Sequence, residues 1–121
     1  MALDPSLADS YVYAYLREDG STYYVGKGRN RRAWVKHRVP VPKDPARIVM
    51  LKTGLSDYMA QVCEIMWIAF YGREDLNEGR LLNLTDGGDG SVGLVFTPES
   101  KARLAASMKR WQSLRLGWLT V

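Results

Sequence analysis

The sequence has little of the two residue types that build most disulfide and zinc sites. It contains one cysteine, Cys63, and one histidine, His37. A single cysteine cannot form an internal disulfide, so the chain does not belong to the disulfide-stabilised secreted domains. One cysteine and one histidine also cannot supply a zinc site of the Cys/His type. Any catalytic metal is therefore expected to be a hard cation bound by oxygen ligands.

Long apolar runs are missing as well. No run approaches the roughly 20 residues that a membrane-spanning helix needs. The opening residues, 1–5, do not follow the pattern of a signal peptide. The chain has 121 residues, of which 46% are hydrophobic, and this suits one compact globular domain. We expect an intracellular protein with no membrane partner.

Acidic residues are absent from the last part of the chain, 101–121. Five cations lie there: Lys101, Arg103, Lys109, Arg110 and Arg115. A second acid-free group comprises Lys27, Arg29, Arg31, Arg32, Lys36 and Arg38. Two concentrations of positive charge favour a polyanionic partner, most readily nucleic acid. The alternative is two solvated faces of a mildly basic protein.

The clearest local pattern is a strict alternation at 11–16. It places three tyrosines on one face and Val12, Ala14 and Leu16 on the other. The polar residues 17–21 include an Asp-Gly pair, which is typical of a hairpin turn, and 22–26 reads as the returning strand. The pattern predicts an antiparallel hairpin. Its tyrosine face comprises Tyr11, Tyr13, Tyr15 and Tyr24.

Capping and periodicity predict the remaining elements. These are a short helix from Asn30 to about His37, a helix over 46–53, a long helix from the cap Ser56 to Tyr71, a strand over 81–85, a glycine-rich turn at 86–90, and a helix from Thr97 to at least Ser113. Tyr58, Val62, Ile65, Met66 and Ala69 share one face of the long helix and are expected in the core. We expect a core domain over 1–93 and a basic helical appendage over 94–121.

Glu64 is the only charged residue between Tyr58 and Gly72. A carboxylate in such apolar surroundings is hydrated along one helix face, paired with a cation, or bound to a metal. Asp57, Gln61 and Glu64 fall on one side of the helix, and this favours a solvated strip. A metal-binding or catalytic use is the alternative.

The tyrosines and the glycine-flanked residues also have two interpretations. A strand tyrosine usually packs, but a phenol close to a cation and a metal-bound water can serve as a general base, because positive neighbours favour the phenolate. His37 is a surface residue, a phosphate contact or a proton carrier. Lys27, between Gly26 and Gly28, lacks the spacing of a nucleotide-binding loop. An asparagine placed like Asn83, beside a glycine loop, most often satisfies turn backbone.

Taken together, these residues resemble the GIY-YIG nuclease superfamily. The tripeptides at 11–13 and 24–26 match the pair that names it, with Tyr11 where the name has glycine. The further matches are Arg32, the downstream His37, Glu64 within its helix, Asn83 in the segment 82–88, and a helical motif over 97–103 like those appended to many homing endonucleases. The resemblance covers about residues 10–115.

The resemblance implies a small α+β fold, with a central three-stranded antiparallel sheet and helices at its sides. It implies hydrolysis of DNA phosphodiester bonds with one magnesium or manganese ion held by Glu64. Tyr13 would act as general base toward the attacking water, with Tyr24 orienting it, and Arg32 would contact the scissile phosphate. Lys27 would bind phosphate or lower the pKa of a tyrosine, His37 would relay a proton, and Asn83 would brace the site.

The DNA-binding role is assigned to the two basic groups. The residues expected to contact DNA are Lys27, Arg29, Arg31, Arg32, Lys36, Lys101, Arg103, Lys109 and Arg110. The basic tail favours a homing-type enzyme, with a repair or restriction nuclease as the alternative. A binding module without catalysis is the third candidate, although such a module usually loses the tyrosine, arginine or glutamate. Double-strand cutting requires either a homodimer on DNA or sequential nicks.

Overall fold

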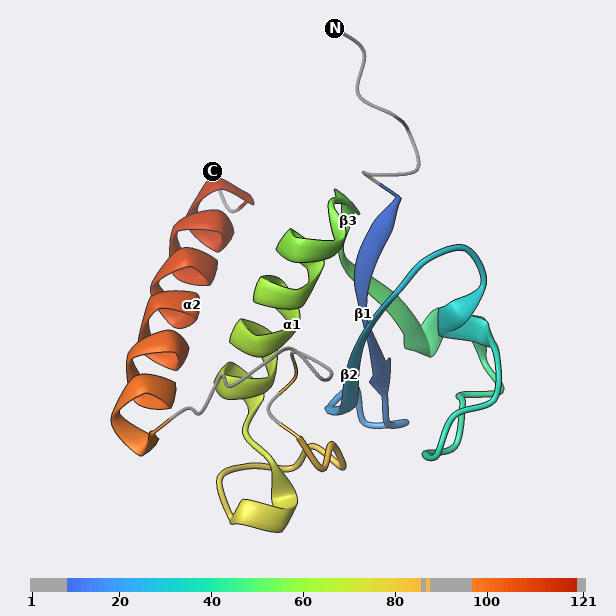
Figure 1. Cartoon of the computed structure of the whole chain (residues 1–121), viewed down its shortest axis with the longest axis horizontal. Coiled ribbons are helices and arrows are strands. Elements are labelled where there is room, and N and C mark those ends of the chain that lie inside the picture. Colours follow the sequence, from blue (N-terminus) through green and yellow to red (C-terminus); the bar gives the residue numbers. More distant parts are fainter. Residues whose placement is uncertain (1–8, 86, 88–96, 120–121) are drawn as a thin grey trace, which may run out of the picture.

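The computed structural model describes residues 9–85, 87 and 97–119, with side chains described as far as Arg110 within the last helix. Strands β1 (Ser10–Leu16), β2 (Thr22–Gly28) and β3 (Ile48–Leu55) form one sheet, and the two α-helices are α1 (Asp57–Tyr71) and α2 (Pro98–Leu119). Figure 1 shows α2 beside α1, α1 beside the sheet, and the connection between β2 and β3 on the far side of the sheet. The expected α+β class with a three-stranded antiparallel sheet is confirmed.

Strand β1 lies in the middle of the sheet, in the order β2-β1-β3, and pairs antiparallel with both neighbours. Tyr13, at the centre of β1, faces Gly26 of β2 and Met50 of β3. The predicted hairpin of β1 and β2 is confirmed. Its turn is closed by backbone hydrogen bonds from Arg17 N to the oxygen of Ser21 and from Gly20 N to the oxygen of Arg17.

The two faces of the sheet pack against different layers. Val12 and Val25 are fully buried in one core cluster with Trp67 and Ile68 of α1. The opposite face carries the tyrosines in a second cluster, which also contains Ala33 and Val39 from the connection after β2. The tyrosine face predicted from the alternation is therefore present, and Tyr24 also packs on it.

Three predicted elements are wrong, and the largest of them is the helix over 46–53. The segment 46–53 does not form a helix: a 3₁₀ turn at Pro45–Arg47 leads into β3. A short apolar run such as the one at 48–51 fits a buried helix or a strand equally well by pattern alone. Pairing with the free edge of β1 decides the outcome, and that pairing is a contact distant in sequence.

The other two corrections flank the hairpin. Asn30 does not cap a helix, because its φ of 54° lies in the left-handed region, and only a 3₁₀ turn at Arg32–Trp34 follows. The segment 81–85 is not a strand. Leu81 forms one bridge with Arg73, and Leu82 N donates a backbone hydrogen bond to the oxygen of Tyr23 in β2. The predicted turn at 86–90 lies outside the described residues except for Gly87.

Helix α1 is confirmed at both ends. The Ser56 hydroxyl accepts a hydrogen bond of 3.1 Å from Met59 N, and Gly72 ends the helix with a φ of 81°. Its predicted core face is wrong at Tyr58, which is 71% exposed. The helix is covered by the sheet on one side and by α2 on the other, so more than one stripe is buried (Figure 1). Trp67 and Ile68 belong to that larger buried surface.

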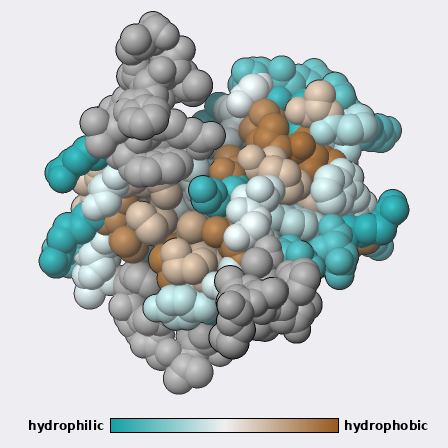
Figure 2. Space-filling model, turned by 90° about the horizontal axis from the view of Figure 1, so that it is seen from above, coloured by the Kyte–Doolittle hydropathy of each residue, from teal (hydrophilic) through white to brown (hydrophobic). Residues whose placement is uncertain are grey.

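Helix α2 begins where the capping signal predicts. Thr97 Oγ1 accepts a bond of 3.1 Å from Ser100 N, and Met108 is buried in the cluster that contains Trp67. Removing α2 would therefore expose part of the core. Among the described residues no helix is long and apolar enough to cross a membrane. On the face seen in Figure 2, apolar surface lies in patches bordered by hydrophilic side chains.

Candidate functional site

A cavity of about 330 Å³ opens between the hairpin, the N-terminal half of α1 and the segment after Leu82. Six of the seven residues predicted to be catalytic line it: Tyr13, Tyr24, Lys27, Arg32, Glu64 and Asn83. They come from five separate stretches of the chain, so the folding of the chain itself brings them together. The seventh, His37, contacts Tyr13 from behind.

Glu64 reaches the cavity from α1, and only 8% of its surface is exposed. The interpretation of this residue as part of a solvated strip is therefore wrong. Asp57 and Glu64 of α1 point to the cavity, and Gly87 also lines it close to the carboxylate. A Cβ built on Gly87 would lie 3.1 Å from Glu64 Oε1, so the backbone at this position passes directly over the carboxylate.

The surroundings of Glu64 suit a magnesium or manganese ion that keeps water ligands. Within residues 9–85, 87 and 97–119, no three Cys, His, Asp or Glu side chains converge as a metal cage would require. Mg²⁺ is commonly bound through one or two carboxylates, with waters and substrate phosphates completing its shell. A buried carboxylate that faces an open, polar cavity fits that mode of binding. Glu64 is the residue here that would hold the metal.

Tyr13 is 1% exposed, and its ring stands over the backbone of Gly26. A Cβ at Gly26 would lie 2.6 Å from Tyr13 Oη and 2.7 Å from Cζ. Such separations are far inside van der Waals contact, so any side chain at Gly26 would displace the phenol. This is the structural reason for a glycine after Tyr24 and Val25.

We therefore predict that Gly26→Ala destabilises the fold by about 1–3 kcal/mol, the usual cost of overpacking. It should also reduce any activity that depends on the Tyr13 hydroxyl. Thermal unfolding measures the first effect. In a Tyr13→Val background, where the ring is absent, the same substitution should cost much less, and an equal cost in both backgrounds would contradict this explanation.

The hydroxyl of Tyr13 is hydrogen-bonded to His37 Nε2, and the two rings are perpendicular with centroids 5.7 Å apart. His37 Nδ1 lies 2.6 Å from the carbonyl oxygen of Val35. A carbonyl only accepts, so Nδ1 carries the proton and Nε2 of the neutral ring accepts from Tyr13. The pair forms a directed path for a proton, from the cavity through Tyr13 to His37.

The pKa directions in this group differ from the expectation of an ionised tyrosine. Burial raises the pKa of Tyr13 above its ordinary value, and the opposing effect of Arg32 is smaller. Burial raises the pKa of Tyr24, and the negative charge of Glu64 adds to that rise. Tyr15, behind Tyr13, has a pKa raised by burial to about 12. The phenols are therefore neutral at pH 7, and Tyr13 can accept a proton only as it passes its own to His37.

His37 is neutral at the same pH, because burial lowers its pKa below the ordinary 6.5. The unfolded chain then binds more protons between the folded pKa and 6.5, so stability is lost as the pH falls through that window. We expect the melting temperature of the wild type to fall between pH 7.5 and pH 5, and to fall less in His37→Gln. Equal decreases in both proteins would show that His37 does not contribute.

Arg32 lies at the start of the 3₁₀ turn that tyrosine hydroxyls hold to the sheet. Tyr11 Oη accepts from Ala33 N at 3.0 Å and donates to the oxygen of Asn30 at 2.9 Å. Tyr15 Oη donates to the oxygen of Ala33 at 2.6 Å. These two tyrosines position the turn, a role that strand alternation alone does not reveal.

Lys27 also lines the cavity, but it has an acidic partner. Its Nζ lies 3.1 Å from Asp57 Oδ1, at the first turn of α1. Asp57 is 69% exposed at its side chain, so the pair is open to solvent and its contribution to stability is small. An incoming phosphate could compete with Asp57 for the ammonium group.

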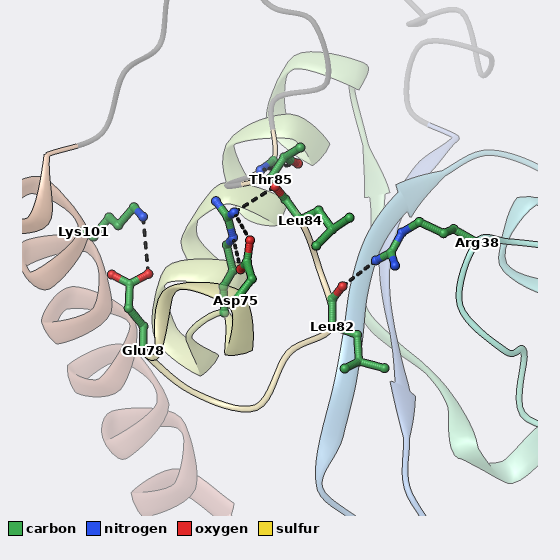
Figure 3. Close-up of polar contacts among 9 residues, drawn as sticks. Arg38, Asp75, Glu78, Leu82, Leu84, Thr85 and Lys101 are labelled. Atoms are coloured by element: carbon green, nitrogen blue, oxygen red, sulfur yellow. Dashed lines mark hydrogen bonds and ion pairs between the residues drawn. The ribbon is translucent and has the colours of Figure 1, made fainter.

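Asn83 completes the sheet edge with its side chain. Its Oδ1 accepts from Val25 N at 3.1 Å and its Nδ2 donates to Val25 O at 2.7 Å, so one amide pairs with both backbone groups of the residue after Tyr24. Figure 3 shows Arg38 beside the oxygen of Leu82, to which it donates a hydrogen bond. Arg73 donates to the oxygen of Leu84 at 2.8 Å. The sequence contains no pattern that predicts these arginine contacts.

The predicted DNA contacts fall into two groups that the fold keeps apart. Arg29, Arg31, Arg32 and Lys36 are exposed on the connection after β2, while Arg103, Lys109 and Arg110 are exposed on α2. In Figure 1 these segments lie on opposite sides of the α1 and sheet layers. Lys101 is turned toward the fold, with its Nζ 3.3 Å from Glu78 Oε1.

Comparison of the chain with protein-family models, with curated proteins and with solved structures finds no match in any of the three.

Proposed function

We propose that the chain is a divalent-metal-dependent endodeoxyribonuclease of the GIY-YIG type. The observation that carries the proposal is that Tyr13, Arg32 and Glu64, which lie far apart in the sequence, line the same cavity. A buried carboxylate can hold a metal ion, a hydrogen-bonded phenol can take a proton, and an arginine can stabilise the charged phosphate, which are roles that serve phosphodiester hydrolysis. The polar cavity and the cations at its rim suit a phosphate backbone better than an apolar ligand.

A divalent cation bound by Glu64 would polarise the phosphate and stabilise the leaving 3′ oxygen. The chain's own residues supply the remaining steps. Tyr13 accepts a proton from the attacking water while its own proton passes to Nε2 of neutral His37. Because the proton moves on to His37, Tyr13 acts as a base without first becoming a phenolate, and the direction of its pKa is no obstacle.

Arg32 neutralises the negative charge that grows on the phosphate in the transition state. Tyr24 packs against Tyr13, with ring centroids 6.2 Å apart, and maintains its orientation. Lys27 and Arg29 line the cavity beside Gly28, where they would contact the phosphate backbone of a DNA strand. Contacts of this kind carry affinity and orientation but no sequence information.

The experiment that tests the proposal is incubation of the full chain with supercoiled plasmid in magnesium or in EDTA. We expect relaxation and linearisation with magnesium and neither product with EDTA. DNA that is retained on a gel but never cut would favour the binding module over the nuclease. DNA that is neither bound nor cut would contradict both.

The α2 cations are proposed to contact DNA outside the cavity. Deletion of α2 would remove buried Met108, so charge removal is the sharper test. Lys109→Ala together with Arg110→Ala should leave folding unchanged and lower the salt slope of DNA binding by about 1.8, at roughly 0.9 for each lost phosphate contact. Lys43→Ala with Arg80→Ala is the matched control, since both cations are exposed and neither is assigned to DNA. Equal slopes in the two variants would remove α2 from the interface.

A further inference from the structure

A second hollow, of about 470 Å³, is lined in part by His37, whose ring contacts Tyr13 of the cavity. Trp34 and residues 36–41 line it. The Trp34 side chain is 48% exposed, which is unusual for the largest apolar side chain in a small domain. The volume of the hollow lies in the range of small-molecule sites. The chemistry of its walls indicates which class of ligand it would bind.

The walls combine an aromatic face with positive charge. Lys36 and Arg38 line the hollow beside Trp34, and Arg31 is exposed on the same turn. No acidic residue occurs between Asp19 and Asp44. A flat aromatic side chain next to cations suits a nucleobase with its phosphate, because the base stacks while the cations neutralise the backbone.

The hollow is held in shape before any ligand binds. Tyr23 Oη donates to the oxygen of Pro40 at 2.5 Å, and Arg38 donates to the oxygen of Leu82. The ring of Trp34 packs edge-on against Tyr11, with centroids 6.2 Å apart. A preformed site requires little ordering on binding, so stacking there would contribute directly to affinity.

We propose that this hollow receives one unpaired nucleobase of the DNA strand whose phosphate lies in the cavity. His37 lines the hollow and contacts Tyr13 of the cavity, so the two sites are adjacent. Both faces of a base within a duplex are covered by its stacking neighbours, so only a bulged, flap or flipped base has a face free to stack on the exposed ring of Trp34. The inference rests on the proposed nuclease function and adds its substrate class: DNA with an unpaired nucleotide beside the scissile phosphate.

The test uses a short DNA duplex that carries one extrahelical 2-aminopurine, and the same duplex with 2-aminopurine paired to thymine. Binding is measured in EDTA, so that no metal-dependent cutting occurs. The wild type should bind the unpaired probe more tightly and quench its fluorescence. Trp34→Leu, which keeps apolar bulk without a π-face, should bind that probe about 5- to 150-fold more weakly, the equivalent of roughly 1–3 kcal/mol for one stacked base. Its affinity for the paired probe should stay unchanged.

Two further variants separate stacking from general effects. Trp34→Phe should restore most of the binding and the quenching. Val35→Ala changes a neighbouring apolar residue that is 42% exposed but does not line the hollow, and it should behave as the wild type. Equal losses on both probes, or no loss in Trp34→Leu, would overturn the proposal.

Cutting assays on the same two probes distinguish failure of the base-site proposal from failure of the nuclease proposal. If magnesium supports cutting of both probes with no preference that depends on Trp34, the hollow is not a base site and the nuclease assignment stands. If Trp34-dependent binding of the unpaired probe is found but magnesium supports no cutting, the base site stands and the nuclease assignment is lost.

Discussion

Glu64→Gln is expected to abolish metal-dependent DNA cleavage, with a loss on the order of 10³-fold or more, because loss of the metal removes several kcal/mol of charge stabilisation. Glutamine has the shape of glutamate, so the buried position should still pack and the protein should still fold. DNA binding should be retained or slightly stronger, since a negative charge near the phosphate is removed. Cleavage rate, gel retention and circular dichroism together measure the three effects.

The matched control is Glu74→Gln, which removes the same charge from an exposed position in the 3₁₀ turn Glu74–Leu76, outside the cavity. It should cut DNA at the wild-type rate. Full activity in a folded Glu64→Gln protein would remove this carboxylate from the site, and with it the proposed metal ligand.

Tyr13→Phe is expected to lose about 10²- to 10⁴-fold in cleavage rate, the usual contribution of a general base. The ring still fills its place over Gly26, and only the hydroxyl that links the cavity to His37 is lost. The cost in stability should be about 1 kcal/mol, the typical worth of one hydrogen bond. A single-turnover rate at saturating DNA, with a thermal melt, measures both.

Tyr24→Phe is the comparison that assigns the role. Tyr24 lines the same cavity, but the hydroxyl that is hydrogen-bonded to His37 is that of Tyr13. Loss of the Tyr24 hydroxyl leaves this proton path intact and should slow cleavage much less. If Tyr24→Phe is inactive and Tyr13→Phe cuts normally, the base is Tyr24 and the path through His37 is not used. Similar losses in both variants would point to a shared structural role.

The hairpin and helix α1 could be predicted because local signals determine them. Alternation over 11–16 assigns each side chain to a face. Ser56 marks the start of α1 through its hydroxyl, and Gly72 marks its end through its backbone N–H. Strand β3 could not be predicted in the same way. Its residues pair with β1 across a long stretch of chain, and their apolar pattern fits helix and strand alike.

For the candidate site, too, the residue types could be predicted from the sequence but their burial and contacts could not. Its residue types were accessible from the sequence, since Glu64 is isolated among apolar neighbours and the tyrosines alternate. The burial of Glu64 and the Tyr13–His37 hydrogen bond depend on how α1 and the connection after β2 cover the two faces of the sheet. The direction of the Tyr13 pKa also follows from burial, and spacing along the chain carries no information about it.

The most direct test of the nuclease assignment is the chemistry of the nicks. Supercoiled plasmid is incubated with the wild type and with Glu64→Gln in magnesium, and the nicked product is then treated with DNA ligase. Hydrolysis with a leaving 3′ oxygen predicts nicks from the wild type alone, with 3′-hydroxyl and 5′-phosphate ends that ligase seals. Nicks that form without magnesium, that appear equally with Glu64→Gln, or that ligase cannot seal would contradict the account.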